Sequence, residues 1–153
     1  MTTPHGSTAA RYCEAGWTGV LALPPRAKGN PLSGFTGREG VDPTPAQVAD
    51  WISTRADGNI ALRLPDGIIG VDVDQYGDKA GTSSLAALET LLGALPPTVM
   101  STSRDNGSGI RLFTVPPGLD WPDIADDIEV IRTGWRYAVV APSIHPEGRV
   151  YGW

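Results

Sequence analysis

Two aspartates separated by one residue end an apolar stretch near the middle of the chain, in the sequence Ile68-Ile69-Gly70-Val71-Asp72-Val73-Asp74. If this stretch is a β-strand, side chains two positions apart project from the same face, about 6 to 7 Å from each other. Asp72 and Asp74 then lie together, while Val71 and Val73 point into the core. Two carboxylates held this close repel each other unless a cation lies between them. The spacing therefore predicts a divalent-metal site, with a solvated acidic turn at the end of a strand as the alternative.

The composition is typical of one soluble globular domain spanning residues 1–153, with 41% hydrophobic and 19% charged residues. The formal net charge of -5 excludes a protein that holds nucleic acid by its overall positive charge, so a polyanionic partner must meet a local basic patch. The single cysteine excludes an internal disulfide and a cysteine-rich zinc site. An apolar run of roughly 18 residues and a signal peptide are both missing, so a cytoplasmic protein without membrane contact is expected.

The chain contains 19 glycines and 14 prolines, which predict short elements joined by defined turns. We expect helices at residues 7–16 and 45–55 and between Gly81 and Gly93. Strands are expected near residues 19–23, 60–64, 68–74, 98–101, 110–115, 128–131 and 137–141. The short connections predict three hairpins, which pair 60–64 with 68–74, 98–101 with 110–115, and 128–131 with 137–141. His5 precedes the first helix, in a terminus expected to be frayed.

Two of the helices carry specific local signals. Thr44-Pro45-Ala46-Gln47 supplies an N-cap, a proline in the first turn and a glutamine placed for a capping box. Leu85, Leu88 and Leu92 recur at helical spacing and predict an apolar stripe that packs on a sheet. With roughly seven strands, the pattern predicts a mixed α and β fold.

Seven short motifs follow one another along almost the whole chain, and their order is more specific than any one of them. They are Lys28-Gly29-Asn30-Pro31, Trp51 in its helix, Asn59-Ile60, Val71-Asp72-Val73-Asp74, Ser108-Gly109, Ile128-Glu129-Val130 and Pro142-Ser143-Ile144-His145, with Tyr151-Gly152-Trp153 at the end. In this order they resemble the N-terminal prim-pol domain of bifunctional DNA primase/polymerases, in the archaeo-eukaryotic primase superfamily.

The resemblance implies a fold and a metal centre. The fold would be α/β (α+β), with an RRM-like mixed or antiparallel sheet, flanking helices and a small N-terminal α/β module. Asp72, Asp74 and Glu129 would hold two Mg²⁺ or Mn²⁺ ions for nucleotidyl transfer. Asp126 and Asp127 compete with Glu129 for the third position, and Glu129 is favoured because a carboxylate within an apolar strand needs a partner.

The resemblance also implies how phosphate groups are held. Lys28, Ser108 and His145 would bind the nucleoside triphosphate, with a solvent-exposed lysine and a structural histidine as the alternatives for Lys28 and His145. A basic patch of Arg104, Arg132 and Arg136 would contact a single-stranded DNA template and its primer, with surface ion pairs as the alternative. The family pattern usually has a histidine after the Ser-Gly of the hairpin, whereas this chain reads Ser108-Gly109-Ile110-Arg111. Because arginine can hold phosphate in a bidentate fork, Arg111 is the candidate triphosphate clamp.

Two other functions fit the same residues. Without the histidine, the chain could be a degenerate domain that binds nucleotide or single strand without turnover. Asp-x-Asp also holds nucleotide sugars in metal-dependent glycosyltransferases, although their catalytic domains are generally longer. Members of the resembled family usually continue into helical and helicase-like regions, so the chain is either a fragment or a minimal form, and a replicative helicase domain or protein is an expected partner.

Overall fold

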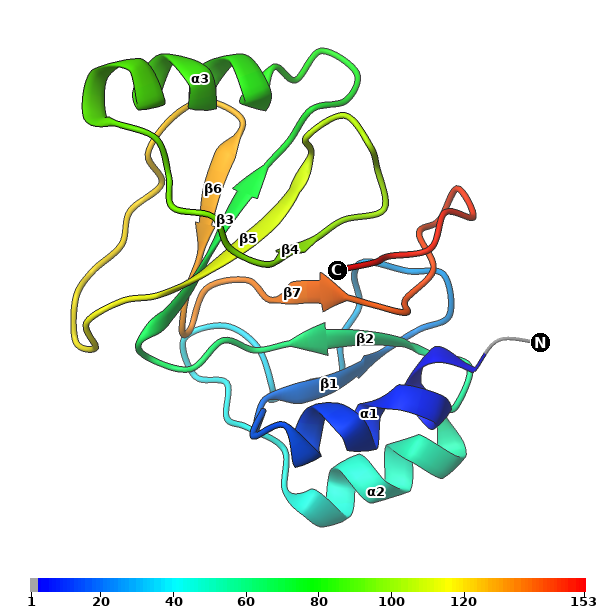
Figure 1. Cartoon of the computed structure of the whole chain (residues 1–153). Coiled ribbons are helices and arrows are strands. Elements are labelled where there is room, and N and C mark those ends of the chain that lie inside the picture. Colours follow the sequence, from blue (N-terminus) through cyan, green and yellow to red (C-terminus); the bar gives the residue numbers. More distant parts are fainter. Residues whose placement is uncertain (1–2) are drawn as a thin grey trace.

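The computed structural model describes residues 3–153 and contains three helices and two antiparallel sheets (Figure 1). The helices are α1 (Pro4–Glu14), α2 (Pro45–Thr54) and α3 (Gly81–Leu92). The strands are β1 (Val20–Leu23), β2 (Asn59–Leu62), β3 (Ile68–Val73), β4 (Met100–Ser101), β5 (Gly109–Thr114), β6 (Ile128–Ile131) and β7 (Ala138–Val140). The predicted α+β class is confirmed, while the narrower RRM-like description remains a prediction.

The first sheet has the order β1-β2-β7 and carries α1 and α2 on one side (Figure 1). Every residue of these three strands is buried, because α1 and the second sheet cover one face while the long segment after β1 covers the other. The predicted capping box starts α2, with the Thr44 hydroxyl accepting from the Gln47 amide and the Gln47 side chain accepting from the Thr44 amide. These two bonds satisfy backbone donors that a helix start leaves free.

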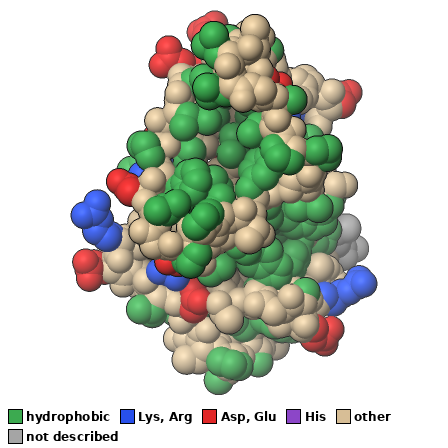
Figure 2. Space-filling view, turned by 60° about the vertical axis from the view of Figure 1, so that its left-hand side comes forward, with side chains coloured by type: hydrophobic (Ala, Val, Ile, Leu, Met, Phe, Trp, Pro, Cys, Tyr) green, Lys and Arg blue, Asp and Glu red, His purple; other side chains and the backbone are tan. Residues whose placement is uncertain are grey.

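The second sheet has the order β4-β5-β3-β6. Alternate side chains of its inner strand β3 lie on opposite faces of this sheet. Val71 and Val73 pack with the β6 side chains and with Leu85 and Leu88 of α3 on one face. Asp72 projects from the opposite face, as strand alternation requires. The predicted leucine stripe of α3 is shorter than expected, because the Leu92 side chain is 82% exposed. Figure 2 shows hydrophobic side chains gathered over one face of the molecule, with few charges among them.

Two of the three predicted hairpins are wrong. β2 pairs with β1 and β7, and β3 pairs with β5 and β6, so residues 63–67 carry the chain from one sheet to the other. β6 and β7 are likewise separated, and the turn between them closes only on an isolated bridge between Arg132 and Trp135. The third hairpin, β4 with β5, is confirmed. The chain therefore crosses between the sheets twice, and this brings residues distant in sequence to a common seam.

In the described part of the chain, no helix combines the length and apolar character needed to span a bilayer. His5 is fully buried in the first turn of α1 and its backbone amide donates to the Gly58 carbonyl at 3.0 Å, so the expected fraying of this segment is wrong.

Candidate active site

A basin of about 350 Å³ lies where the two sheets meet, and this size is within the range usual for small-molecule sites. Its wall includes Asp72 of β3, Ile110 of β5 and Glu129 of β6 from one sheet, and Val139 of β7 from the other. The sheets are joined beside it by Ser101, whose hydroxyl donates to the Val139 carbonyl at 2.8 Å.

The three predicted acids all line this basin. Asp72 and Glu129 lie directly across from each other in the antiparallel register of β3 and β6, so their side chains leave the same face of the sheet. Asp74 follows the end of β3, where its amide donates to the Asp127 carbonyl at 2.9 Å. The pairing of β3 with β6 thus brings together two carboxylates, Asp72 and Glu129, that are 57 positions apart in the sequence.

Asp72 is costly to ionise in this environment. Burial, followed by repulsion from Asp74 and Glu129, raises the pKa of Asp72 to about 6, although Lys28 and Lys79 act in the opposite direction. Positive charge in the basin therefore stabilises the ionised Asp72.

Two basic side chains partly supply that charge. The Lys79 ammonium donates to the Asp74 carboxylate, and this hydrogen bond raises the pKa of Lys79. The Arg136 guanidinium lies 3.4 Å from Glu129 Oε1. Arg136 has a φ of 63°, a left-handed conformation that costs about 1 kcal/mol for a non-glycine residue. Within residues 3–153, no three His, Cys, Asp or Glu side chains are close enough together to form a ready metal cluster.

A buried amide holds two loops over the basin. The Asn59 side chain donates to the carbonyls of Ala27 and Ile144 at 2.9 and 2.7 Å and accepts from the Ile144 amide at 2.8 Å. These bonds fix the segments that carry Lys28 and His145, and both of those residues line the basin. The Tyr137 hydroxyl adds a bond to the Lys28 carbonyl at 2.9 Å.

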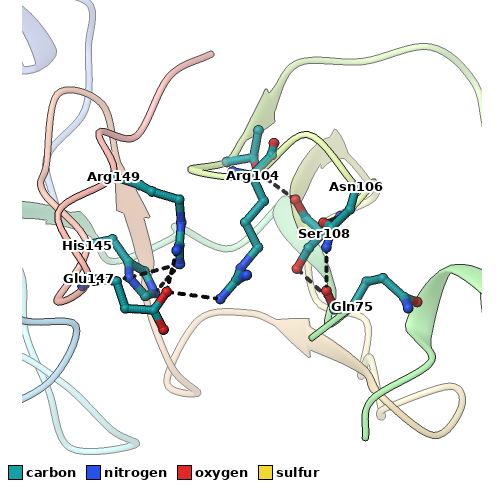
Figure 3. Close-up of polar contacts among 8 residues, drawn as sticks. Gln75, Arg104, Asn106, Ser108, His145, Glu147 and Arg149 are labelled. Carbon is teal, nitrogen blue, oxygen red and sulfur yellow. Dashed lines mark hydrogen bonds and ion pairs between the residues drawn. The ribbon is translucent and has the colours of Figure 1, made fainter. Parts of the chain in front are cut away.

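Most of the predicted phosphate-contacting residues reach the basin: Lys28, Arg104, Ser108, Arg136 and His145 all line it. Ser108 is engaged by the protein itself, since its hydroxyl donates to the Val73 carbonyl at 3.0 Å and accepts from the Gln75 amide at 3.2 Å. Figure 3 shows the contact between Ser108 and Gln75 beside Arg104. Ser108 therefore shapes the end of β3.

Arg111 and Arg132 lie elsewhere. The register pairs Ile110, and not Arg111, with Asp72, so the Arg111 side chain leaves the opposite face and donates to the carbonyls of Gly107 and Gly109. Arg111, the candidate triphosphate clamp, therefore does not line the basin, and its contact with a triphosphate stays a prediction. Arg132 is 3.6 Å from Asp123 and 5.5 Å from the Trp135 ring, outside the basin.

The basin also contains residues that sequence reasoning did not single out. Tyr76 has three cations near its ring, with Lys28 at 5.7 Å, Lys79 at 5.1 Å and Arg104 at 4.9 Å from the centroid. A lone lysine and tyrosine in a turn carry no distinctive signal, but their position just after Asp74 could have suggested them. Tyr137 and Tyr151 complete the aromatic part of the wall.

Comparison with protein-family models gives a match that covers residues 9–153 and is described as the N-terminal domain of bifunctional DNA primase/polymerase. Comparisons with curated proteins and with solved structures gave no match. The matched region contains both sheets, all seven strands and every residue named above as lining the basin. On this evidence the chain belongs to the Prim-Pol family of bifunctional DNA primase/polymerase N-terminal domains.

Proposed function

We propose that this domain transfers nucleotides from nucleoside triphosphates onto a primer paired with a single-stranded template, and that the reaction takes place in the basin. The observation that carries the proposal is the register pair Asp72 and Glu129, with Asp74 at the same rim. The family membership favours this chemistry over that of a nucleotide-sugar transferase.

The donor set suits hard divalent cations, since three carboxylates offer only oxygen ligands. The raised pKa of Asp72 supports the same reading, because the site lacks sufficient positive charge of its own. Two Mg²⁺ or Mn²⁺ ions held by Asp72, Asp74 and Glu129 would activate the attacking hydroxyl and neutralise the leaving pyrophosphate. Lys79 contacts one oxygen of Asp74 and Arg136 contacts one oxygen of Glu129, so each carboxylate keeps a second oxygen for a metal ion.

The other residues of the basin position the substrate. Four basic side chains line it, Lys28, Lys79, Arg104 and Arg136, although the chain has a net charge of -5. This local basic patch is what a polyanionic substrate requires in an acidic protein. Phosphoryl-type transfer depends mainly on positioning and charge neutralisation, so these residues need supply no nucleophile.

One observation favours a second candidate, a domain that binds nucleotide or single strand without turnover. Ile110, the residue that faces Asp72 from β5, is apolar and nearly buried, and it directly follows the Ser-Gly of the hairpin. Arg111, which stands in place of the histidine usual in the family pattern, leaves the opposite face of the sheet and does not line the basin, so it offers the substrate no polar contact there.

Incorporation of a labelled nucleotide on a primed single strand in Mn²⁺ separates the two candidates. Incorporation that disappears in Asp72→Asn supports the polymerase. Triphosphate binding without incorporation, in protein whose melting is cooperative, supports the binding domain and rejects turnover.

A further inference from the structure

The turn formed by residues 145–149 gathers basic side chains around one acid. Arg149 Nη1 donates to the Glu147 carboxylate, and Arg104 Nη2 lies 3.9 Å from the same oxygen, Oε2. Arg26 also reaches the turn, where its Nη2 donates to the Pro146 carbonyl at 3.2 Å. Three of the 12 basic residues of the chain therefore meet at one carboxylate-bearing turn.

The two arginines that share Glu147 come from different parts of the fold. Arg104 belongs to the connection between β4 and β5, and Arg149 to the segment after β7. Figure 3 shows the Arg104 side chain extending toward Glu147, and Arg149 extending toward the same carboxylate from above. The fold thus brings two guanidinium groups to the Glu147 carboxylate, and we call the pair Arg104 and Arg149 the arginine fork.

The fork is held in place by groups other than Glu147. Arg149 Nη2 lies 3.1 Å from His145 Nδ1, which also accepts from the Glu147 amide at 3.1 Å. Burial and the nearby Arg149 lower the pKa of His145, so its ring is neutral and Nδ1 stays an acceptor. Arg104 packs against the Tyr76 ring at 4.9 Å. Both guanidinium groups therefore keep their positions if the carboxylate moves.

Glu147 is a weak occupant of this fork. Its side chain is 59% exposed, and exposed ion pairs contribute little to stability. A phosphate group carries more charge than a carboxylate and offers three oxygens, which suit bidentate binding by arginine. Arg149 Nε is also buried without a partner among residues 3–153, so its donors are not all used.

We propose that Arg104 and Arg149 form a phosphate-binding clamp that Glu147 closes, as an internal substitute for phosphate, when no ligand is bound. Arg104 and His145 also line the basin, so the clamp extends it toward the C-terminal segment. The phosphate comes either from a free polyphosphate tail or from the backbone of a single strand. The inference rests on the proposed function only for the identity of that ligand, since the clamp itself needs no catalysis.

Calorimetric binding of inorganic tripolyphosphate, and fluorescence anisotropy with a labelled single-stranded oligodeoxynucleotide, test the clamp in the presence of a chelator. Glu147→Gln is expected to tighten binding of at least one of the two probes by about fivefold, and Arg149→Gln to weaken it by about tenfold. Two matched controls change the same charges on exposed residues outside the turn, Glu39→Gln and Arg11→Gln. They are expected to change either affinity less than about twofold.

The probe that responds identifies the source of the phosphate. A response with tripolyphosphate assigns the clamp to a polyphosphate tail, and a response with the oligonucleotide alone assigns it to the strand backbone. If Glu147→Gln behaves like Glu39→Gln with both probes, or Arg149→Gln like Arg11→Gln, the clamp is rejected. A protein that lacks incorporation but shows Glu147-sensitive binding rejects the proposed function and keeps the clamp.

Discussion

Asp72 lies between two strands, facing Glu129 on β6 and Ile110 on β5 at the same level of the sheet. One neighbour is an anion and the other is an apolar side chain. Asp72 therefore has no polar partner on its β5 side and an anion on its β6 side. Removing its charge should consequently affect both the stability and the activity of the protein.

Asp72→Asn keeps the shape of the side chain and removes its charge. Nucleotide incorporation is expected to fall by about 100-fold or more, because one of three carboxylate ligands is lost. In a chelator at pH 7 the variant should be more stable than the parent by roughly 1 to 3 kcal/mol, because a partly buried anion facing two others has been neutralised.

Denaturant unfolding and a primer-extension assay measure both effects of Asp72→Asn. Asp120→Asn changes the same charge on an exposed residue outside the basin and should alter neither. A variant that is as active as the parent would remove Asp72 from the chemistry.

Arg111 and Arg136 should respond differently to the same substitution. Arg136→Met removes a cation that lines the basin, so the KM for nucleotide is expected to rise by about tenfold, as for loss of a charged hydrogen-bond partner. Arg111→Met alters a side chain on the opposite face, and the KM should stay within about twofold. Steady-state incorporation kinetics distinguish them, and a larger effect at Arg111 would contradict the register of β3 and β5.

Asn59 should contribute to both stability and substrate binding. Asn59→Ala leaves the backbone groups of Ala27 and Ile144 without their partners, which is expected to lower the free energy of unfolding by about 2 to 4 kcal/mol. The KM should rise as well, because the loops that carry Lys28 and His145 lose their anchor.

Chemical unfolding compares Asn59→Ala with Asn106→Ala, which removes an exposed hydrogen bond to the Gln75 carbonyl and a part-buried one from the Ser108 amide. That control is expected to cost about 1 kcal/mol, because neither bond is fully buried. Equal losses in the two variants would show that the buried amide is not the anchor.

Gly81 allows the start of α3 to lie close to the backbone of Asp74 and Asp127, beside the basin. A Cβ at this position would lie 2.6 Å from the Asp74 carbonyl oxygen and 2.7 Å from that of Asp127. Gly81→Ala is therefore expected to cost about 1 to 3 kcal/mol and to reduce incorporation by displacing Asp74. Gly29→Ala is the control, since a Cβ there meets nothing within 4 Å. Thermal melting that treats the two variants alike would contradict this close approach.

His5 should make the fold sensitive to mild acid. Burial, helped by Arg55, lowers the pKa of His5 to about 4 from its ordinary value of 6.5. Below pH 6.5, His5 is protonated in the unfolded chain but stays neutral in the folded chain, so the free energy of unfolding falls as the pH drops. This decrease levels off near pH 4, where His5 becomes protonated in the folded chain as well.

The loss attributable to His5 amounts to about 3 kcal/mol across this window. Comparing urea unfolding of the parent and His5→Phe at pH 7, 5.5 and 4 isolates it from the titration of the carboxylates. The stability difference between the two proteins should shift in favour of the variant as the pH falls, and a constant difference would show that His5 does not titrate in this way.

Local signals predicted most elements correctly because their physical causes are local. The Thr44 cap, the alternation along β3 and the Leu85 and Leu88 pair each act within a few residues. Strand pairing was less accessible. The connection of residues 63–67 is short enough for a hairpin turn and long enough to reach the other sheet. The burial of β2 on both faces is what distinguishes a crossing between sheets from a hairpin.

The same difference between local signals and strand pairing determines which site residues could be predicted from the sequence. Asp72 and Asp74 follow from strand parity alone, and Glu129 from the cost of a carboxylate in an apolar strand. Choosing between Ile110 and Arg111 requires the register of β5, because a shift of one residue exchanges the two faces. That register depends on the backbone conformation of Gly109, whose φ of 154° favours glycine, and on the Ser108 contacts, which the sequence does not reveal.

The seam between the sheets has a mechanical consequence. The acids belong to one sheet, whereas Asn59 ties the segments carrying Lys28 and His145 to the other. A ligand that contacts both the acids and these segments connects the two sheets. Ligand binding in the basin should therefore make the two sheets unfold together and slow motions of one sheet relative to the other.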